Sequence, residues 1–156
     1  MTLRLLLIRH GLSSYNRENR IQGRNNLSTL TPEGITQASK IGEALKGLTI
    51  HAIYSSPLKR AKDTASELLR VHSPNKNIIL DNDLLEVDLE PWSGLTIDEV
   101  KAKFPDSYLT WKKSPSELEI KREDGTKYNP VKELMDQAKQ FLEKVLLTHK
   151  SENNEN

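Results

Sequence analysis

The sequence predicts an α/β protein with a parallel sheet, because short apolar runs alternate with longer amphipathic stretches. Apolar runs at residues 3–8, 51–55 and 77–80 have the length and composition typical of strands. Amphipathic stretches begin at Thr31-Pro32 and Ser56-Pro57, each next to one of these runs. Parallel strands need long crossover connections, which are usually helices, so this order indicates helices packed on a parallel sheet.

The first three helices are expected from their starts and their apolar spacing. Thr31 and Ser56 would cap the first two, because each hydroxyl can accept a hydrogen bond from the first turn, which the following Pro suits. A third helix is expected after Thr96, which forms a capping-box pattern with Glu99, and should stop before Pro105. The apolar faces of the first two helices are Ile35, Ala38, Ile41 and Leu45, and Leu58, Ala61, Ala65, Leu68 and Leu69.

The last helix is expected to begin at Asn129-Pro130 and to end near Leu147. A wholly polar stretch, residues 150–156, follows it. We therefore expect residues 1–149 to belong to one domain and residues 150–156 to be a polar tail or linker. The apolar face of this helix consists of Val131, Leu134, Met135, Ala138, Phe141, Leu142 and Val145.

The composition excludes several function classes. The 156 residues have the length of one ordinary domain, and 23 basic against 22 acidic residues give a net charge of +1, unlike the strongly basic face of most nucleic-acid binders. The chain has no cysteine, which excludes disulfides, thiolate zinc sites and a cysteine nucleophile. The longest apolar run, residues 5–8, is too short to span a membrane, and no secretory signal precedes it. We expect a cytoplasmic protein with neither a nucleic-acid nor a membrane partner.

The stretch from Ile8 to Asn16 is the main indication of function. The first apolar run ends in Arg9-His10-Gly11, which places a cation, an imidazole and a flexible turn at the end of a strand. Open α/β sheets bind their ligands outside the carboxyl ends of their strands. A guanidinium fork suits two phosphate oxygens, and histidine can act as a nucleophile. The stretch therefore indicates a phosphate site.

Two further segments could complete this site. Arg60 lies near the start of the helix that follows residues 51–55, where free N–H groups favour an anion. Alone it is more typical of a solvated cationic face, but together with Arg9-His10-Gly11 it favours phosphate binding. Glu86 has apolar neighbours that could raise its pKa and keep a proton available for transfer. The alternative is a loop carboxylate without a catalytic task.

Three motifs in this order resemble the histidine phosphatase superfamily, whose fold is that of the phosphoglycerate mutases. They correspond to the nucleophile loop, a helix start and the arginine helix of that family. The resemblance covers the chain from Leu3 to the end of the last helix. Residues 86–94, followed by Phe104-Pro105, Trp111 and Pro115, are especially similar to cyanobacterial phosphatase or mutase-like members. The motifs are Arg9-His10-Gly11 with Ser13, Asn16 and Gln22-Gly23; Leu30-Thr31-Pro32-Glu33-Gly34-Ile35-Thr36-Gln37-Ala38; and Ser55-Ser56-Pro57-Leu58-Lys59-Arg60-Ala61 with Thr64-Ala65.

The resemblance implies a three-layer α/β/α sandwich and a role for each matching residue. His10 would attack phosphorus and carry the phosphoryl group, while Arg9 and Arg60 hold the phosphate oxygens. Glu86 would protonate the leaving alkoxide and later deprotonate water. The family needs no metal and no cofactor for this chemistry, because the arginines supply the positive charge. The implied substrate-binding residues are Ser13, Asn16, Gln22 and Gly23.

The resemblance also implies a second catalytic histidine, in a strand after the last helix. His149 does not match that position, because it lies at a helix end or linker and no strand precedes it. It is expected to be structural or solvated, as are His51 and His72. We therefore expect residues 1–149 to be the N-terminal part of a single histidine phosphatase domain. The fold would then be incomplete at its C-terminus, with low stability and weak activity in the isolated chain.

The predicted function is hydrolysis of a small phosphorylated metabolite through a phosphohistidine, with activity reduced or lost in this chain. One alternative is a cofactor-dependent phosphoglycerate mutase, for which Lys121-Arg122 is a weak candidate for the additional basic cluster of that class. Another is a non-catalytic phosphate-binding module. Neither the substrate nor the oligomeric state is indicated by the sequence.

Overall fold

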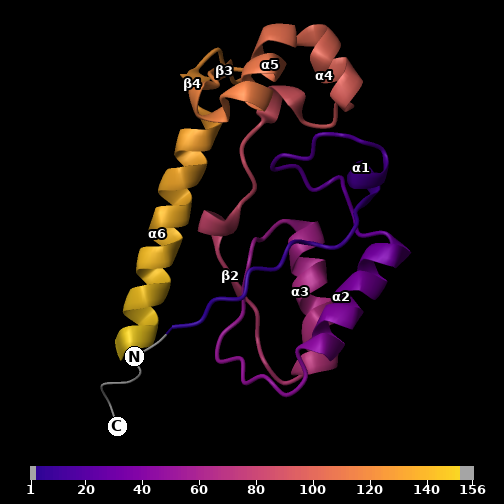
Figure 1. Cartoon of the computed structure of the whole chain (residues 1–156), viewed down its shortest axis with the longest axis vertical. Helices are drawn as coiled ribbons and strands as arrows, with labels where there is room; N and C mark the ends of the chain where they lie inside the picture. The colour runs from indigo at the N-terminus through magenta and orange to yellow at the C-terminus, as the bar shows by residue number, and fades with distance from the viewer. Residues whose placement is uncertain (1–2, 152–156) are drawn as a thin grey trace.

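A small parallel sheet lies at the centre of the computed structural model, which describes residues 3–151 (Figure 1). Strand β1 (Tyr54–Ser55) pairs with β2 (Ile79–Leu80), with Tyr54 opposite Ile79 and Ser55 opposite Leu80. The N–H groups of Ile79 and Asp81 donate to the carbonyls of Ile53 and Ser55, at 2.8 and 2.9 Å. The predicted second and third strands are thus confirmed, although each is shorter than the apolar run that predicts it.

Helices lie on both sides of this sheet. Helices α2 (Pro32–Ala44) and α3 (Lys59–His72) lie side by side on one side, and the long helix α6 (Pro130–Ser151) lies on the other (Figure 1). The ring of Tyr54 in β1 meets Phe141 of α6 edge-on, with centroids 5.4 Å apart. The α/β/α layering is therefore as predicted. Within the described part of the chain, no helix is both long and apolar enough to cross a membrane.

A second region packs beyond the carboxyl end of this sheet, around the buried ring of Trp92. The segment after β2 leads to helices α4 (Ile97–Lys103) and α5 (Pro105–Lys113). An antiparallel hairpin of β3 (Ile120–Lys121) and β4 (Lys127–Tyr128) then leads into α6. The sequence predicts neither α5 nor this hairpin. The buried apolar residues of this region form one cluster, the Trp92 cluster: Val87, Leu89, Trp92, Val100, Leu118, Ile120 and Tyr128.

Most helix starts follow the predicted caps. Thr31 Oγ1 accepts from the N–H of Gly34 at 3.1 Å, and Thr96 forms a reciprocal capping box with Glu99. The start of α3 differs, because the helix begins at Lys59 and Ser56 does not cap it. Ser56 Oγ instead accepts from the N–H of Leu58, two residues on, at 3.4 Å, which places it in a turn ahead of the helix.

The prediction of a strand at residues 3–8 is wrong. This segment is extended and runs between α6 and the α2–α3 pair (Figure 1), but no segment within residues 3–151 forms a ladder with it. Backbone N–H and C=O groups define a strand only when a neighbour pairs with them. Its apolar side chains are exposed as a result, and Leu7 retains 92% of its accessible surface.

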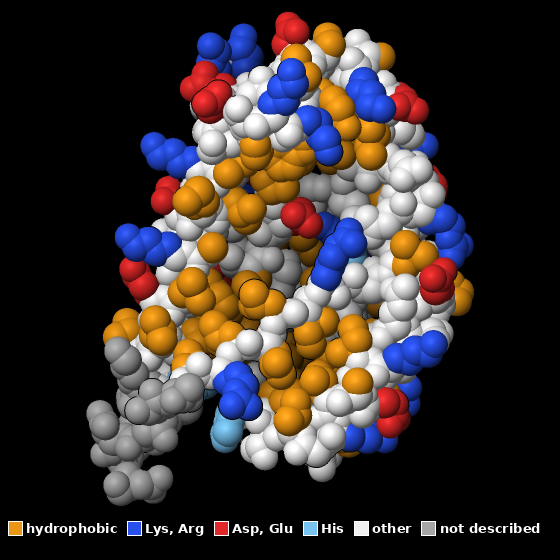
Figure 2. Space-filling model, in the orientation of Figure 1, with side chains coloured by type: hydrophobic (Ala, Val, Ile, Leu, Met, Phe, Trp, Pro, Cys, Tyr) orange, Lys and Arg blue, Asp and Glu red, His pale blue; other side chains and the backbone are white. Residues whose placement is uncertain are grey.

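The apolar face predicted for α6 is also largely open. Val145 is buried, whereas Met135 is 65% exposed and Leu142 is exposed as well. Figure 2 shows apolar side chains gathered on the face of the molecule between α6 and the α2–α3 pair. This face is called the open apolar face below. Its exposed members from the N-terminal segment, β2 and α6 are Leu3, Leu5, Leu6, Leu7, Ile8, Ile79, Leu80, Leu142 and Leu146.

Candidate active site

His10 lies half-buried at the end of the extended N-terminal segment, with its ring fixed by its own neighbour. Its Nδ1 lies 2.8 Å from the carbonyl oxygen of Gly11. A carbonyl only accepts, so Nδ1 carries the proton and the lone pair of the neutral ring is on Nε2. Burial lowers the pKa of His10, and the charges of Arg60 and Arg9 lower it further, against the Gly11 hydrogen bond and Glu86. The neutral ring, which is the nucleophilic form, is therefore favoured.

Two glycines allow the backbone after His10 to touch the start of α2. A Cβ on Gly11 would lie 2.3 Å from the carbonyl oxygen of Gly34, and a Cβ on Gly34 would lie 2.2 Å from the carbonyl oxygen of Leu12. Neither position can hold a side chain without moving the backbone of the other segment. The Gly of each motif is thus explained by one contact, which holds His10 against the α2–α3 layer.

The rest of the Leu30–Ala38 motif fixes the same contact. The N–H of Thr31 donates to the carbonyl of Leu12 at 2.9 Å, and the N–H of Leu12 donates to Gln37 Oε1 at 2.9 Å. Ala38 is fully buried. No side chain of this motif needs to touch a substrate, because its contacts position the loop that carries His10.

Arg60, in the first turn of α3, is the most deeply buried charged residue of the site, with 1% of its surface exposed. Its Nη1 donates to the carbonyl of Asn25 at 3.1 Å and its Nη2 to the carbonyl of Gly23 at 2.8 Å. Its Nε is buried and has no hydrogen-bond partner. A buried charged donor without a partner is costly, which points to an anion as its missing acceptor.

Thr64 joins Arg60 to the His10 loop. Its Oγ1 donates to the carbonyl of Arg60 at 2.7 Å and accepts from the N–H of Gly11 at 3.0 Å. Thr64 belongs to the arginine-helix motif, and its four-residue spacing from Arg60, one helical turn, indicates the contact with Arg60. The contact with Gly11 joins segments far apart in the sequence, so no spacing indicates it.

The predicted substrate-binding residues share one hydrogen-bonded cluster. Ser13 caps the short helix α1 (Ser14–Arg17), and its Oγ lies 2.9 Å from Asn16 Oδ1 and 2.8 Å from Gln22 Oε1. The hydroxyl has a single proton and donates to one of these amides at a time, and the NH2 groups of both side chains are donors that could bind an anion. Gly23 follows at φ 51°, in the left-handed region, where its carbonyl accepts from Arg60.

Glu86 and Arg9 are the more open members of the predicted site. The apolar neighbours of Glu86 in the sequence do not enclose it, because the residue is exposed, with Oε1 accepting from the N–H of Val87 at 3.2 Å. Its charge nevertheless acts on both His10 and Arg60. Arg9 is exposed and lowers the pKa of His10 through its charge. The structure therefore brings the predicted nucleophile, acid and arginines within electrostatic reach of one another.

Two of the other histidines make structural contacts. His149 lies on α6, where Nε2 is 3.2 Å from the hydroxyl of Tyr54. His72 ends α3, with Nε2 3.1 Å from the carbonyl of Leu48.

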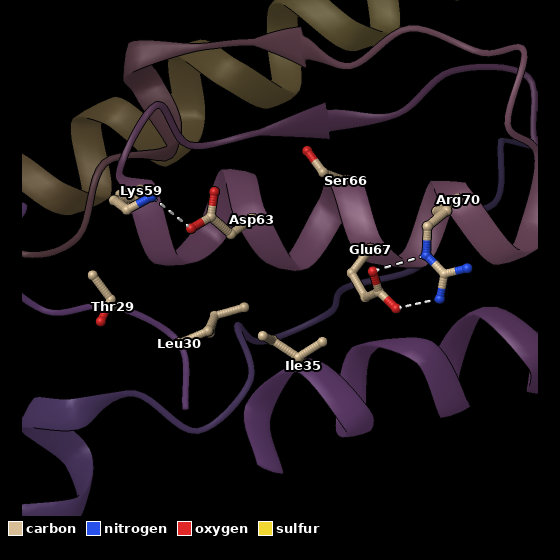
Figure 3. A pocket seen from close by; sticks show the side chains of 8 residues that line it. All are labelled: Thr29, Leu30, Ile35, Lys59, Asp63, Ser66, Glu67 and Arg70. Carbon is tan, nitrogen blue, oxygen red and sulfur yellow. Dashed lines mark hydrogen bonds and ion pairs between the residues drawn. The ribbon is translucent and has the colours of Figure 1, made fainter. Parts of the chain in front are cut away.

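A separate hollow of the described surface lies between α3 and the loop before α2 (Figure 3). It has a volume of about 460 Å³ and does not include His10. Its charges pair with one another, since Lys59 lies 3.1 Å from Asp63 and Arg70 lies 2.6 Å from Glu67. The Arg70 hydrogen bonds, together with Ser39, lower the pKa of Glu67 to about 2. This cleft therefore offers no unpaired charge to a phosphate.

Comparison with known proteins gives matches over almost the whole chain. Residues 5–154 match the histidine phosphatase superfamily (branch 1). The chain is 38% identical over 146 residues to a 2-carboxy-D-arabinitol-1-phosphatase of Triticum aestivum, covering 94% of this chain and 28% of that protein. It is 31% identical over 147 residues to phosphoserine phosphatase 1 of Hydrogenobacter thermophilus, covering 94% of this chain and 66% of that protein. The structure of Bacillus stearothermophilus YhfR aligns with a TM-score of 0.80 at 27% identity, over 90% of this chain and 66% of that one.

Proposed function

The chain belongs to the histidine phosphatase superfamily, and from this premise we propose that it hydrolyses a small phosphate monoester through a phosphohistidine on His10. The observation that carries the proposal is that His10 and Arg60, which lie close enough for the charge of Arg60 to act on His10, each have an unsatisfied nitrogen. The Nε2 lone pair of His10 is left for attack because Nδ1 is held by Gly11. The buried Nε of Arg60 has no acceptor until an anion supplies one. A phosphate ester satisfies both.

The reaction proceeds in two steps. In the first, His10 Nε2 attacks phosphorus, the bond from phosphorus to the leaving oxygen breaks, and Glu86 donates its proton to that oxygen. In the second, Glu86 takes a proton from water, the water oxygen attacks phosphorus, and the N–P bond breaks to release inorganic phosphate. Arg60 and Arg9 stabilise the phosphoryl oxygens in both transition states. No step requires a metal.

The activity of the whole protein is part of this proposal. The chain spans 28% and 66% of the length of the two curated phosphatases described above. The named activities of those relatives support a phosphatase that acts on a small phosphorylated metabolite.

Labelling of His10 tests the proposal directly. The chain would be mixed with ³²P-labelled phenyl phosphate and quenched in alkali, in which phosphohistidine survives, and the labelled peptide identified. We expect label on His10, none in His10→Ala, and unchanged labelling in His51→Ala, which alters an exposed histidine. Binding of inorganic phosphate without any label would instead favour the non-catalytic binding module.

The phosphoglycerate mutase alternative is less well supported. Its candidate basic residue, Arg122, is already engaged: Nη2 lies 2.9 Å from Glu133 and 3.4 Å from Asp88, and the guanidinium lies 3.7 Å from the ring centre of Tyr128. An arginine held in this way is less available to a second phosphoryl group. Incubation with 3-phosphoglycerate and 2,3-bisphosphoglycerate should release phosphate faster than it forms 2-phosphoglycerate, and the reverse order would favour the mutase.

A further inference from the structure

Arg24, which belongs to none of the three sequence motifs, connects three separate parts of the structure. Its Nε donates to the backbone carbonyl of Glu86 at 3.0 Å, and its Nη2 donates to Gln137 Oε1 of α6. Its Nη1 lies 3.8 Å from Asp88 Oδ2. The side chain is 30% exposed, and each of its three nitrogens faces a partner. The side chain therefore joins neighbouring segments and is not free to bind a substrate.

The backbone of Arg24 lies directly beside the arginine of the site. The preceding residue, Gly23, accepts the Nη2 hydrogen bond of Arg60 at 2.8 Å. Two consecutive residues therefore contact two members of the candidate site. The carbonyl of Gly23 accepts from the guanidinium of Arg60, and the side chain of Arg24 donates to the backbone of Glu86.

Glu86 depends on such a contact because its local structure is irregular. It lies between the short 3-10 turns η1 (Asn82–Leu84) and η2 (Glu90–Trp92), outside any helix or strand, and is exposed. The hydrogen bond of its carboxylate is local, to the N–H of Val87. That contact does not fix Glu86 relative to His10, whereas the Arg24 contact joins its backbone to the loop that holds Arg60.

We propose that Arg24 is a positioning residue that sets the place of Glu86 relative to His10 and so controls proton donation to the leaving group. This proposal rests on the proposed phosphatase function. Arg24 does not touch the reacting atoms and acts through Glu86. Its loss should weaken the step that needs an acid and spare the attack of His10 on phosphorus.

Leaving-group dependence separates these two effects. An aliphatic alkoxide leaves poorly without a proton, whereas p-nitrophenolate leaves well without one. For Arg24→Gln we expect kcat/KM for an alkyl phosphate such as glycerol 1-phosphate to fall by about 10-fold to 100-fold, toward the usual worth of a general acid. The value for p-nitrophenyl phosphate should fall by no more than about threefold. Equal losses for both substrates would mean a merely structural role and would overturn the proposal.

Arg20 provides a matched control within the same loop region. It is similarly exposed, at 35% of its side chain, and its Nη1 donates to the carbonyl of Gly94 at 2.8 Å, so its contact resembles that of Arg24 but does not involve Glu86. Arg20→Gln should change kcat/KM for the two substrates by the same factor. Arg24→Lys should restore little, because a single ammonium cannot reproduce three donors in a fixed fork.

A titration of His10 tests the position of Glu86 without turnover. Glu86 raises the pKa of His10, so Glu86→Gln should lower that pKa when it is followed by NMR in the full 156-residue chain. Arg24→Gln should lower it in the same direction, although removal of a positive charge alone could only raise it. Arg20→Gln should leave it unchanged. An unchanged or raised pKa in Arg24→Gln, or no shift in Glu86→Gln, would overturn the proposal.

The two measurements also separate this proposal from the proposed function. If the unsubstituted chain hydrolyses neither ester and takes no label, the phosphatase function fails. The titration then still decides whether Arg24 holds Glu86 near His10.

Discussion

The Trp92 cluster and the small sheet both contain large apolar side chains, but those of the cluster are buried and many of those around the sheet are exposed. Trp92 is fully buried, with Phe104, Tyr108 and Trp111 packed around it at centroid distances of 6.2–6.4 Å. The sheet side instead carries the open apolar face, where Leu7 is 92% exposed. The difference shows that apolar content alone does not make a core, because a strand also needs a neighbour that pairs with its backbone and covers its side chains.

The candidate site lies between these two regions and draws on both. His10 comes from the segment that crosses the open apolar face, whereas Glu86 precedes the Trp92 cluster. Arg60 lies at the start of α3, in the α2–α3 layer. His10, the proposed nucleophile, is thus carried on the less covered side. The contacts of Gly11 with Gly34 and Thr64 compensate for this, since they fix the loop to α2 and α3.

Of the substitutions considered, removal of the Trp92 indole ring should cause the largest loss of stability. Trp92→Ala deletes a fully buried aromatic side chain, which typically costs about 3–5 kcal/mol. We expect a loss of that size in the free energy of unfolding, measured by urea denaturation monitored by circular dichroism. A loss below about 1 kcal/mol, the scale of a tolerated core swap, would show that the cluster does not act as the main core.

Gly34→Ala should cause the next largest loss of stability, because it disrupts the contact between the loop after His10 and the start of α2. The new Cβ would lie 2.2 Å from the backbone oxygen of Leu12, so backbone must shift, at a cost of about 1–3 kcal/mol. The displaced segment carries His10, so labelling of His10 should fall as well. Lys40→Ala, an exposed substitution on the same helix, is the control and should change neither. Full retention of both properties in Gly34→Ala would contradict the role given to this contact.

The contact of Gly11 with Gly34 illustrates which local features of the candidate site the sequence indicates. Each site motif contains a residue type that indicates its local structure: a Gly where two backbones touch, a Thr that caps a helix, and an Arg one helical turn from a Thr. These residue types can be recognised from a single sequence. The roles of Thr64 and Arg24 were missed because they are contacts between distant segments, Gly11 with Thr64 and Arg24 with Glu86, which spacing along the chain cannot show.

Strand formation was predicted less well for a physical reason. The apolar run at residues 3–8 satisfies the composition of a strand, but pairing is decided by what lies beside it, and within residues 3–151 nothing forms a ladder with it. Conversely, α5 was missed because Pro105 predicts the end of one helix and also begins the next. The exposed position of Glu86 likewise depends on how its loop is placed rather than on its apolar neighbours.

A smaller and pH-dependent effect is expected where α6 joins the sheet region. Lys144 Nζ lies 2.7 Å from carboxylate oxygens of both Asp81 and Asp83, and the Lys144 hydrogen bond holds the pKa of Asp81 below its usual range. A lowered folded pKa stabilises the protein above the unfolded value, near pH 4, and the contribution is lost as the pH falls through the folded pKa. Asp81→Asn should therefore lower the urea midpoint at pH 7 but not at pH 2. An equal change at both pH values would contradict this ion pair.

Substitution on the open apolar face should have the smallest effect on folding and the most informative one on association. Leu7→Ser alters a side chain that is already almost fully exposed, so it should change the free energy of unfolding by less than about 0.5 kcal/mol, as surface substitutions usually do. Exposed apolar surface and unpaired strand edges favour association, so the same variant should bind less of a hydrophobic dye and self-associate less in sedimentation velocity. Leu109→Ser, on α5 and 51% exposed, is the control outside this face. If Leu7→Ser instead destabilises the chain as strongly as Trp92→Ala, residues 3–8 are packed in solution and the contrast between the two regions does not hold.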